Sequence, residues 1–303
     1  MVSDSRPILV TGASGLLGEA VAARLAARGD AVLAIDVAEA PDARVPVVVC
    51  DVTDTLGLRE LTAGGVSAVV HCGAFSGPMV ARDRPDSMVQ VNIVGTANVL
   101  EIARIHRAKR FVFASSTTVY GETGPAPVKE ETPPRVASLY AASKVASEQL
   151  VTAYAAQYGV SGVSLRLSWV YGPRRMTDCV IRDMIMDAQA GRATRMTFGR
   201  DFARQFIHVD DAARALVLAL DAPEVPRPVL NVTGGTRVTL GDIGRLVAAT
   251  VPGADIELAP GPDPVDQNQE RVDIAAAAED LGYVPTVTLE AGVRSYAAWL
   301  ATR

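Results

Sequence analysis

The sequence predicts an α/β fold in which a doubly wound parallel sheet is combined with a smaller C-terminal domain. Apolar runs and helical patterns alternate through the first half of the 303 residues, and this alternation is typical of a parallel sheet covered by helices on both faces. The first unit, residues 7–36, passes from an apolar run through three glycines into a helical pattern, and then into a second apolar run. The hydrophobic fraction of 49% is ample for a substantial core.

The glycine-rich turn after the first predicted strand has the spacing of a dinucleotide phosphate site. Gly12 permits a tight turn, Gly15 lets backbone N–H groups approach a pyrophosphate, and Gly18 lets the helix pack closely on the sheet. Asp36 ends the second strand of this unit. A carboxylate there accepts hydrogen bonds from a ribose 2′-OH and repels a 2′-phosphate, so we expect a Rossmann domain that binds NAD rather than NADP.

The elements that follow are predicted from apolar runs and their flanking residues. Strands are expected over 45–50, 66–71, 111–115 and 163–167, and helices over 56–63, 87–107 and 139–158. Asp51 would either meet an adenine ring or cap the next helix, and the pattern leaves both roles open. Residues 205–220 are expected to return to the first domain as a strand and a helix capped by Asp210 or Asp211, and an amphipathic helix is expected to end near Trp299.

We expect two domains that exchange segments of the chain. The NAD-binding domain would comprise residues 1–171 and about 205–233, and the substrate-binding domain residues 172–204 and about 234–303. A loop expected at 168–175 interrupts the doubly wound pattern. A proline-rich loop at 121–137 would form one wall of the substrate cleft.

Charge and cysteine usage argue against several classes of protein. The net charge of −5 and the lack of a Lys/Arg block disfavour nucleic acid and anionic membranes as partners. No apolar segment approaches the roughly 20 residues that span a bilayer, and the first strand follows the N-terminus too closely for a signal peptide, so we expect a soluble, cytoplasmic protein. Cys50, Cys72 and Cys179 lack disulfide or zinc-ligand spacing. His71 beside Cys72 resembles a pair of metal ligands, but the apolar run around it favours a core position.

Tyr140 and Lys144 lie about one turn apart in the helix expected over 139–158, and Ser116 follows the fifth strand. Oxidation of a secondary alcohol needs a base for the hydroxyl proton and donors for the developing oxyanion. A lysine ammonium and a positive nicotinamide nearby would favour the tyrosine phenolate, which otherwise forms only at about pH 10. Ser116 would position the substrate oxygen, and Lys144 could also hold the nicotinamide ribose. The set predicts an NAD-dependent oxidoreductase.

Several stretches resemble extended short-chain dehydrogenases/reductases of the NAD-dependent epimerase/dehydratase family. They are TGASGLLG, AID, DV, HCGA, VNIVGTANVLEIAR, FASSTTVYG, YAASK, YGP and RQFIHVDDAARAL. The resemblance implies that Tyr140 is the catalytic base, Lys144 its partner, and Ser116, not Ser115, the catalytic hydroxyl. It also implies a homodimer, in which the helix from Ser87 and the Tyr140 helix pack into a four-helix bundle.

The predicted binding residues follow the same stretches. The cofactor residues are expected to be Gly12, Ser14, Gly15, Leu16, Leu17, Gly18, Asp36, Asp51, Val52, Gly73, Ala74, Asn92, Tyr140 and Lys144. The substrate residues are expected to be Ser76, Thr117, Thr118, Trp169, Arg175, Arg204 and Arg271. Asn92 is expected to order backbone near the site rather than to touch substrate, and no metal is expected.

Two departures from the family pattern bear on the reaction. Thr117 and Thr118 stand where the family's 4,6-dehydratases carry an Asp-Glu pair, so water elimination is not expected. Trp169 stands where sugar-nucleotide enzymes usually have an Asn that helps to bind the diphosphate, although arginines remain that could bind an anion. Two activities stay open: a sugar or sugar-nucleotide epimerase that keeps its NAD, and a net dehydrogenase of a free sugar, sugar acid or polyol that exchanges NADH.

Overall fold

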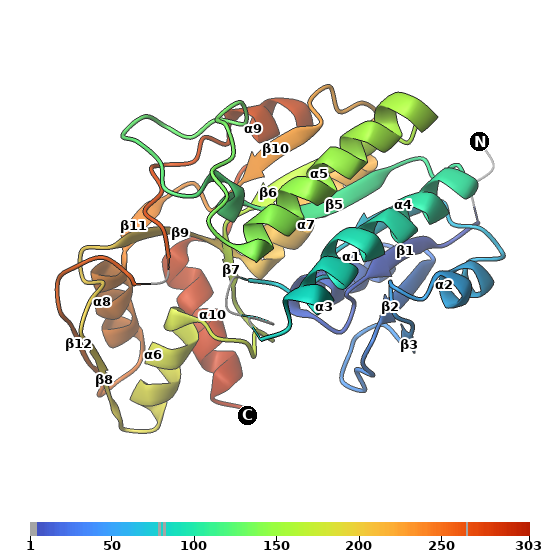
Figure 1. Cartoon of the computed structure of the whole chain (residues 1–303). Helices are drawn as coiled ribbons and strands as arrows, with labels where there is room; N and C mark the ends of the chain where they lie inside the picture. The colour runs from blue at the N-terminus through green and yellow to red at the C-terminus, as the bar shows by residue number, and fades with distance from the viewer. Residues whose placement is uncertain (1–4, 78–79, 81–82, 265) are drawn as a thin grey trace.

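A seven-stranded parallel sheet dominates the computed structural model, which describes residues 5–77, 80, 83–264 and 266–303 (Figure 1). The strand order is β10-β6-β5-β4-β1-β2-β3. The strands are β1 (Ile8–Thr11), β2 (Val32–Asp36), β3 (Val47–Val49), β4 (Ala68–His71), β5 (Phe111–Ser116), β6 (Gly162–Leu167) and β10 (Val229–Val232). This order, with crossover helices on both faces, confirms the predicted doubly wound fold.

Helices cover both faces of this sheet, which explains why its central strands are unbroken apolar runs. Val10 belongs to a core shared with α1 (Leu16–Ala27) and α7 (Val209–Asp221). Leu9, which points to the opposite face, packs in a core with α2 (Thr55–Leu61), α4 (Gly95–Ile105) and α5 (Leu139–Tyr158). Figure 1 shows α4 and α5 side by side across this second face.

The helix expected over 87–107 is built from three helical segments. These are α3 (Pro85–Val89), a π-helical turn (Gln90–Val94) and α4. The carbonyl oxygen of Asn92 accepts hydrogen bonds from the hydroxyls of Thr96 at 2.6 Å and Ser147 at 2.8 Å. These hydroxyls satisfy a backbone group inside the wider turn, and such π-turns often occur at functional sites.

The rest of the chain forms two smaller sheets and most of the remaining helices, which lie beside the main sheet in Figure 1. The three-stranded sheet joins β7 (Trp169–Tyr171), β9 (Ala203–His208) and β11 (Arg237–Thr239), and the two-stranded sheet joins β8 (Ala193–Met196) and β12 (Asp255–Leu258). The helices are α6 (Val180–Gln189), α8 (Leu240–Thr250), α9 (Ala275–Leu281) and α10 (Leu289–Leu300).

Two expectations are wrong in this region. The segment expected to be a loop contains strand β7, and the strand expected to return to the first domain is β9, which pairs with β7 and β11 instead of the main sheet. The physical reason is aromatic packing. Trp169 lies opposite Phe206 in the β7–β9 ladder, and Tyr171 and Phe206 pack edge to face in the second core. Only α7 returns to the main sheet, as expected.

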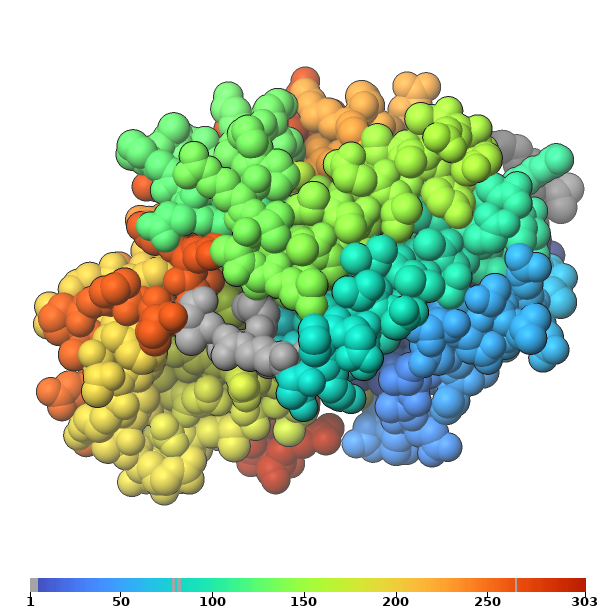
Figure 2. Space-filling view, in the orientation of Figure 1, coloured from blue at the N-terminus to red at the C-terminus, as the bar shows by residue number. Residues whose placement is uncertain are grey.

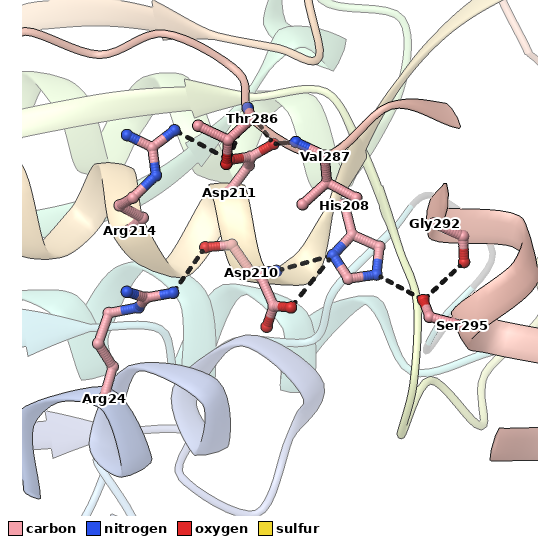
Figure 3. A network of polar contacts seen from close by, with 9 residues as sticks. All are labelled: Arg24, His208, Asp210, Asp211, Arg214, Thr286, Val287, Gly292 and Ser295. Atoms are coloured by element: carbon pink, nitrogen blue, oxygen red, sulfur yellow. Dashed lines mark hydrogen bonds and ion pairs between the residues drawn. The ribbon is translucent and has the colours of Figure 1, made fainter. Parts of the chain in front are cut away.

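Helix α7 begins directly after His208, and this histidine is its cap (Figure 3). Nδ1 of His208 accepts a hydrogen bond of 3.3 Å from the backbone N–H of Asp210, and Nε2 lies 3.4 Å from Oγ of Ser295 in α10. The expectation that Asp210 or Asp211 caps the helix is therefore wrong. Both carboxylates lie in the first turn, where they face the positive end of the helix.

Asp211 joins α7 to the segment that leads into α10 (Figure 3). Its carboxylate accepts hydrogen bonds from the backbone N–H groups of Thr286 at 2.9 Å and Val287 at 2.8 Å, and pairs with Arg214 at 2.9 Å. Burial alone would raise the pKa of Asp211. The hydrogen bonds from Arg214 and the other donors outweigh this effect, so the pKa lies below its ordinary value. An ionised Asp211 thus anchors the C-terminal helix to the first core.

Besides the apolar cores on the two faces of the main sheet, a further core, named here the second core, lies in the rest of the chain. The second core gathers side chains of β7, β9, α6, α8 and α10. The exact division of the chain stays a prediction, and the packing departs from it at one place: Ala277, Leu281 and Tyr283, expected in the substrate domain, pack in the core of the main sheet.

None of the helices in the described part of the chain is long and apolar enough to cross a membrane. Within the same residues, nowhere do three or more His, Cys, Asp or Glu side chains gather as a metal site requires. The expectation about a signal peptide falls in part on residues 1–4, which lie outside the described residues.

Candidate active site

A cavity of about 720 Å³ lies at the carboxyl ends of the strands of the main sheet. The lining residues come from the segments that follow β1 to β5, from Tyr140 and Lys144 of α5, and from residues 167–170 and 174–177. The cavity gathers most of the predicted site residues: Gly12, Ser14, Gly15, Leu16, Leu17, Gly18, Asp36, Asp51, Val52, Gly73, Ala74, Ser76, Ser116, Thr117, Thr118, Tyr140, Lys144, Trp169 and Arg175.

The glycine turn has no room for larger side chains at two positions. A Cβ on Gly18 would lie 2.1 Å from the carbonyl oxygen of Gly12, and a Cβ on Gly12, whose φ is +70°, would lie 2.7 Å from the backbone of Cys72. The start of α1 therefore lies directly against the turn. Its N-cap, Gly15, carries no side chain that could satisfy the first N–H groups, so these groups are available to an anion in the cavity. This geometry fits the pyrophosphate of a dinucleotide.

Asp36 is fixed at the end of β2, next to the glycine turn. Oδ2 accepts a hydrogen bond of 2.9 Å from the backbone N–H of Ser14, and Oδ1 accepts one of 2.7 Å from the backbone N–H of Val37. Both oxygens keep lone pairs for a further donor. The carboxylate is thus oriented in the cavity, as recognition of a ribose diol requires.

Asp51 lies in the same cavity, and one of its two expected roles is excluded. The N-cap of α2 is Asp54, whose carboxylate accepts a hydrogen bond of 3.0 Å from the backbone N–H of Gly57. Asp51 instead accepts a bond of 2.8 Å from the backbone N–H of Thr53. A helix-capping role for Asp51 is therefore wrong, and a role beside the adenine stays a prediction.

Asn92, a predicted cofactor residue, is buried and is not among the residues that line the cavity. Its Oδ1 accepts a hydrogen bond of 2.8 Å from the backbone N–H of Phe75, and its Nδ2 donates one of 2.9 Å to Oγ of Ser143. Ser143 in turn donates to the carbonyl oxygen of Tyr140 at 2.8 Å. Asn92 thus joins the segment after β4 to the helix of Tyr140, as expected of a side chain that orders backbone.

Three hydroxyl groups converge at the centre of the cavity, those of Tyr140, Ser116 and Ser76. Ser116 Oγ accepts hydrogen bonds from the hydroxyl of Thr118 at 2.9 Å and from its backbone N–H at 3.2 Å, so its own proton is left for Tyr140 or a substrate. Burial raises the pKa of Tyr140, and hydrogen bonds with Ser116 and Ser76 together with the charge of Arg175 lower it only in part. A positive charge nearby is thus needed to form the phenolate at neutral pH.

Lys144 supplies a positive charge next to Tyr140. Its Nζ lies 5.7 Å from the centre of the Tyr140 ring and 4.8 Å from that of Phe113. Burial lowers the pKa of Lys144 to about 8, against the opposing effects of Cys72 and Glu148. At pH 7 most of the side chain stays protonated. Burial also raises the pKa of the Cys72 thiol to about 12, so Cys72 is not a thiolate nucleophile here.

A buried ion pair beneath the cavity explains the directions of Ser115 and Ser116. Glu148, one turn beyond Lys144 and 1% exposed, pairs with Arg166 through bonds of 2.9 and 2.7 Å. Ser115 Oγ donates to the same carboxylate at 2.5 Å. Successive side chains of a strand point to opposite faces, so Ser116 points into the cavity. Both serines line the cavity, and the choice of Ser116 as the catalytic hydroxyl stays a prediction.

Arg174, Arg175, Arg204 and Arg271 are the arginines that could bind an anion, and their surroundings differ. Arg174 lines the cavity. Arg175 lines the cavity, but its guanidinium donates to the carbonyl oxygens of Val170 and, at 2.8 Å, Asp178. Arg271 is exposed and lies outside the set of residues that line the main cavity. The structure therefore does not bring Arg271 together with the other predicted residues.

Arg204 lies in a smaller pocket that shares Thr117, Thr118 and Trp169 with the main cavity. Its guanidinium stacks on the Trp169 ring at 4.5 Å. It also forms ion pairs with Asp263 at 2.8 Å and Asp266 at 2.7 Å, so its charge is already balanced by carboxylates.

Some cavity residues escaped the sequence-based prediction of the site. Met176 and Thr177 line the cavity, and Gln269 donates a hydrogen bond of 2.7 Å to the carbonyl oxygen of Thr117. These residues lie in irregular segments, and their approach to the site depends on contacts between distant parts of the chain. No local spacing could have indicated Gln269.

Comparison with known proteins identifies the family of this chain. The model of the NAD dependent epimerase/dehydratase family matches residues 8–233. UDP-glucuronate 4-epimerase 4 of Arabidopsis thaliana is 30% identical over 325 aligned positions, which cover 96% of this chain and 74% of that protein.

Two solved structures are similar over almost their whole length. The UDP-glucose 4-epimerase of Thermotoga maritima, solved with UDP-glucose, has a TM-score of 0.89 and 25% identity, covering 98% of this chain and 99% of that one. The UDP-glucose 4-epimerase of Thermus thermophilus, solved with NAD, has a TM-score of 0.86 and 28% identity, covering 97% and 99%. The chain therefore belongs to the NAD dependent epimerase/dehydratase family and is an NAD-dependent enzyme of the extended short-chain dehydrogenase/reductase type.

Proposed function

We propose that this enzyme interconverts two epimers of a nucleoside diphosphate sugar by oxidising and then re-reducing one ring carbon. The observation that carries the proposal is the convergence of Ser116, Tyr140 and Lys144 in the cavity that also contains the glycine turn. The similar proteins described above are 4-epimerases of UDP-glucuronate and UDP-glucose, which supports a UDP-hexose or UDP-hexuronate as substrate and C4 as the carbon.

The proposed roles of the side chains follow from their contacts. Tyr140 takes the proton of the substrate hydroxyl during oxidation and returns a proton during reduction. The ammonium of Lys144 favours the phenolate, and Ser116 donates a hydrogen bond to the substrate oxygen. NAD, when bound, supplies the hydride acceptor and donor. Between the two transfers the sugar must present its other face, so the cavity has to hold the diphosphate while the ring turns.

Water elimination is not part of the proposal. Thr117 and Thr118 line the cavity at the positions next to Ser116, and neither side chain can act as a carboxylic acid or base. Thr118 Oγ1 is instead engaged with Ser116. The site thus has hydroxyls for proton transfer and orientation, but lacks an acid–base pair at these two positions.

Trp169 and Arg204 support a second candidate, a net dehydrogenase of a free sugar, sugar acid or polyol. Trp169 cannot supply the hydrogen bonds of a compact amide, and Arg204 is already paired with Asp263 and Asp266. A diphosphate would have to compete with these carboxylates for Arg204. A substrate without a diphosphate would not.

The experiment that tests the proposal combines product analysis with the cofactor state of the freshly purified protein. Incubation with UDP-glucuronic acid or UDP-glucose should yield the 4-epimer, detected by chromatography, with NAD bound stoichiometrically and no free NADH released. Release of NADH on addition of free sugars or sugar acids would favour the dehydrogenase. Protein that forms neither the epimer nor NADH would contradict both.

The homodimer also belongs to this proposal. Val94 and Ile105 on the α4 side and Leu139 and Tyr158 on α5 are exposed apolar or aromatic side chains, at 38–56% of their full surface. Figure 2 shows these two helices side by side on one face of the molecule. Light scattering should give twice the chain mass, and Ile105→Glu should shift the protein to the monomer. The cytoplasmic location stays a prediction.

A further inference from the structure

Arg174 reaches from the C-terminal wall of the cavity to the loop between β2 and β3. Its Nη2 donates a hydrogen bond of 2.9 Å to the carbonyl oxygen of Asp42, and its Nε lies 3.6 Å from Oε2 of Glu19. Arg174 also lines the cavity, together with Leu16 and Leu17 at the start of α1. One side chain therefore connects three segments around the mouth of the cofactor cavity.

Glu19 is the buried centre of these contacts. It lies in the first turn of α1 and is 3% exposed. Its carboxylate accepts hydrogen bonds of 2.8 and 2.7 Å from Nε and Nη2 of Arg44. Burial alone would raise the pKa of Glu19. Arg44 and Arg174 outweigh this effect, so the pKa lies below its ordinary value and Glu19 is ionised at neutral pH. A buried carboxylate of this kind holds both guanidinium groups.

These contacts join two segments of the chain next to the cavity. The loop with Asp42 and Arg44 follows Asp36, which lines the cavity, and Arg174 belongs to the segment 174–177, which lines it too. Glu19, Asp42 and Arg44 are not among the residues that line the cavity, so in the described structure they act on its contents only through others.

The backbone of Arg174 supports a specific positioning role. Its φ is +74°, a left-handed conformation that residues other than glycine rarely adopt. From this backbone position the side chain contacts Glu19 and Asp42. In a non-glycine residue it persists only where surrounding contacts hold it, and the contacts with Glu19 and Asp42 are the ones the structure shows.

We propose that Glu19, Arg44 and Arg174 form a clasp that closes the cavity over NAD and slows its dissociation, with Arg174 as the side chain that opens. The inference deepens the proposed function, because an epimerase must keep its reduced cofactor until the hydride returns. For NAD to leave, the wall around residue 174 has to separate from the β2–β3 loop, and this breaks the contacts of Arg174 with Asp42 and Glu19. Loss of the clasp should speed release without changing the proton-transfer groups.

The test measures NAD dissociation in the absence of sugar. Full-length protein is saturated with radiolabelled NAD and then chased with excess unlabelled NAD. Glu19→Gln and Arg174→Ala should each release label about 10-fold faster than the wild type, the effect expected from loss of about one charge-assisted hydrogen bond. The double variant should be no faster than Arg174→Ala, because both changes open the same clasp.

Arg303→Ala is the matched control. Arg303 contacts the same loop, with Nη1 3.5 Å from a carboxylate oxygen of Asp42, but it is not a cavity residue and does not contact Glu19. Its variant should release NAD at the wild-type rate. Urea unfolding of each variant checks that the fold is intact, and Glu19→Gln keeps the shape of the buried side chain.

Three results would contradict the proposal that the clasp slows NAD release. Release from both single variants within about twofold of the wild type would show that the contacts do not limit dissociation. Faster release from Arg174→Ala alone would mean that Arg174 acts by touching the cofactor directly. Rate increases that multiply in the double variant would mean that the two residues act independently. Failure of the proposed function is separable, since it shows in the reaction products of the wild type rather than in these rate ratios.

Discussion

The Nζ atom of Lys144 donates a hydrogen bond of 2.8 Å to the carbonyl oxygen of Ala114 and lies 4.8 Å from the centre of the Phe113 ring. The ammonium is therefore buried between a backbone oxygen of β5 and an aromatic face. This environment brings the charge close to Tyr140, but burial also lowers its pKa from 10.5 to about 8. The side chain that serves the chemistry thus reduces the stability of the fold.

Lys144→Met should stabilise the protein at pH 7 while abolishing turnover. Between about pH 8 and 10.5 the unfolded chain binds the lysine proton and the folded chain does not, so the free energy of unfolding of the wild type rises with pH in this window. At pH 7, burial of the charged Lys144 lowers the free energy of unfolding by on the order of 3 kcal/mol. We expect the free energy of unfolding of the variant to be higher by about 1–3 kcal/mol. Urea unfolding at pH 7 and pH 10 should show this gain shrinking. A less stable variant at pH 7 would mean that the contacts with Ala114 and Phe113 outweigh the cost of burial.

His71 should contribute to acid denaturation. Its Nδ1 lies 2.6 Å from Thr11 Oγ1 and its Nε2 lies 3.0 Å from Thr96 Oγ1, which accounts for both ring nitrogens and confirms the expected core position. Burial lowers its pKa to about 3. The unfolded chain binds a proton between about pH 6.5 and 3 and the folded chain does not, so stability is lost as pH falls through this range.

His71→Gln isolates that contribution. The amide replaces a neutral ring that has one donor and one acceptor, so the variant should lose about 1–3 kcal/mol at pH 7 through poorer hydrogen bonding. The difference in free energy of unfolding between the variant and the wild type should be smaller at pH 5. There the unfolded wild type gains a proton on His71, and the variant has no such group. Urea midpoints at the two pH values measure it. A constant difference would show that His71 does not titrate on unfolding.

Tyr140→Phe should reduce epimerase turnover by about 10²–10⁴-fold, the usual effect of losing a general acid–base group. The ring is retained and the hydroxyl lies among Ser116 and Ser76, so the affinity for NAD should stay within about twofold of the wild type. Rapid kinetics and NAD titration measure the two quantities separately. Turnover near the wild-type value would remove Tyr140 from the proposed base role.

Asp36→Ala should weaken NAD binding by about 10–100-fold and NADP binding much less, because the charged acceptor is lost while repulsion of the 2′-phosphate is relieved. Asp36→Asn is the matched control, since its amide oxygen can still accept the hydrogen bond from the Ser14 N–H. Calorimetric titration of each variant with both cofactors gives the ratio. If the ratio of NAD to NADP affinity were unchanged in both variants, Asp36 would not contact the ribose.

Trp169→Asn should change the choice of substrate but not the binding of NAD. The substitution removes the ring on which Arg204 stacks and restores an amide at the mouth of the smaller pocket. We expect kcat/KM for a UDP-sugar to change by at least about 10-fold relative to a free sugar. Parallel assays with both substrates and an NAD titration provide the measurement. Equal losses in all of them would identify Trp169 as a packing residue only.

Local spacing was sufficient to predict which residues of the expected NAD site share one cavity. The glycine turn, Asp36 and the Tyr140–Lys144 pair each lie within one strand–turn–helix unit or one helical turn, so the sequence determines their relative positions almost directly. The ends of parallel strands then meet at one edge of the sheet, which brings Ser116 to Tyr140.

The substrate half depends on pairings between distant segments, and there the predictions were weaker. Strand β9 pairs with β7 because aromatic side chains meet across the ladder, and no periodicity in either short segment indicates this partner. Arg204 forms ion pairs with the carboxylates of a loop about 60 residues later in the chain. The sequence around Arg204 does not indicate these partners. The cap of α7 was missed for a local reason, because His208 takes the place that Asp210 or Asp211 would fill in a helix starting later.

The order of the strands in the main sheet also affects how the protein is made. Strand β6 ends at Leu167, but its neighbour β10 and the covering helix α7 come only after residues 168–208 have formed β7, β8, α6 and β9. A nascent chain that ends within this interval has six strands of the sheet but lacks α7, which packs on β4, β5 and β6. At roughly 5–20 residues per second, that apolar face stays open to water and to chaperones for seconds. The N-terminal half alone therefore cannot bury its own core, and the NAD-binding domain is completed late in synthesis.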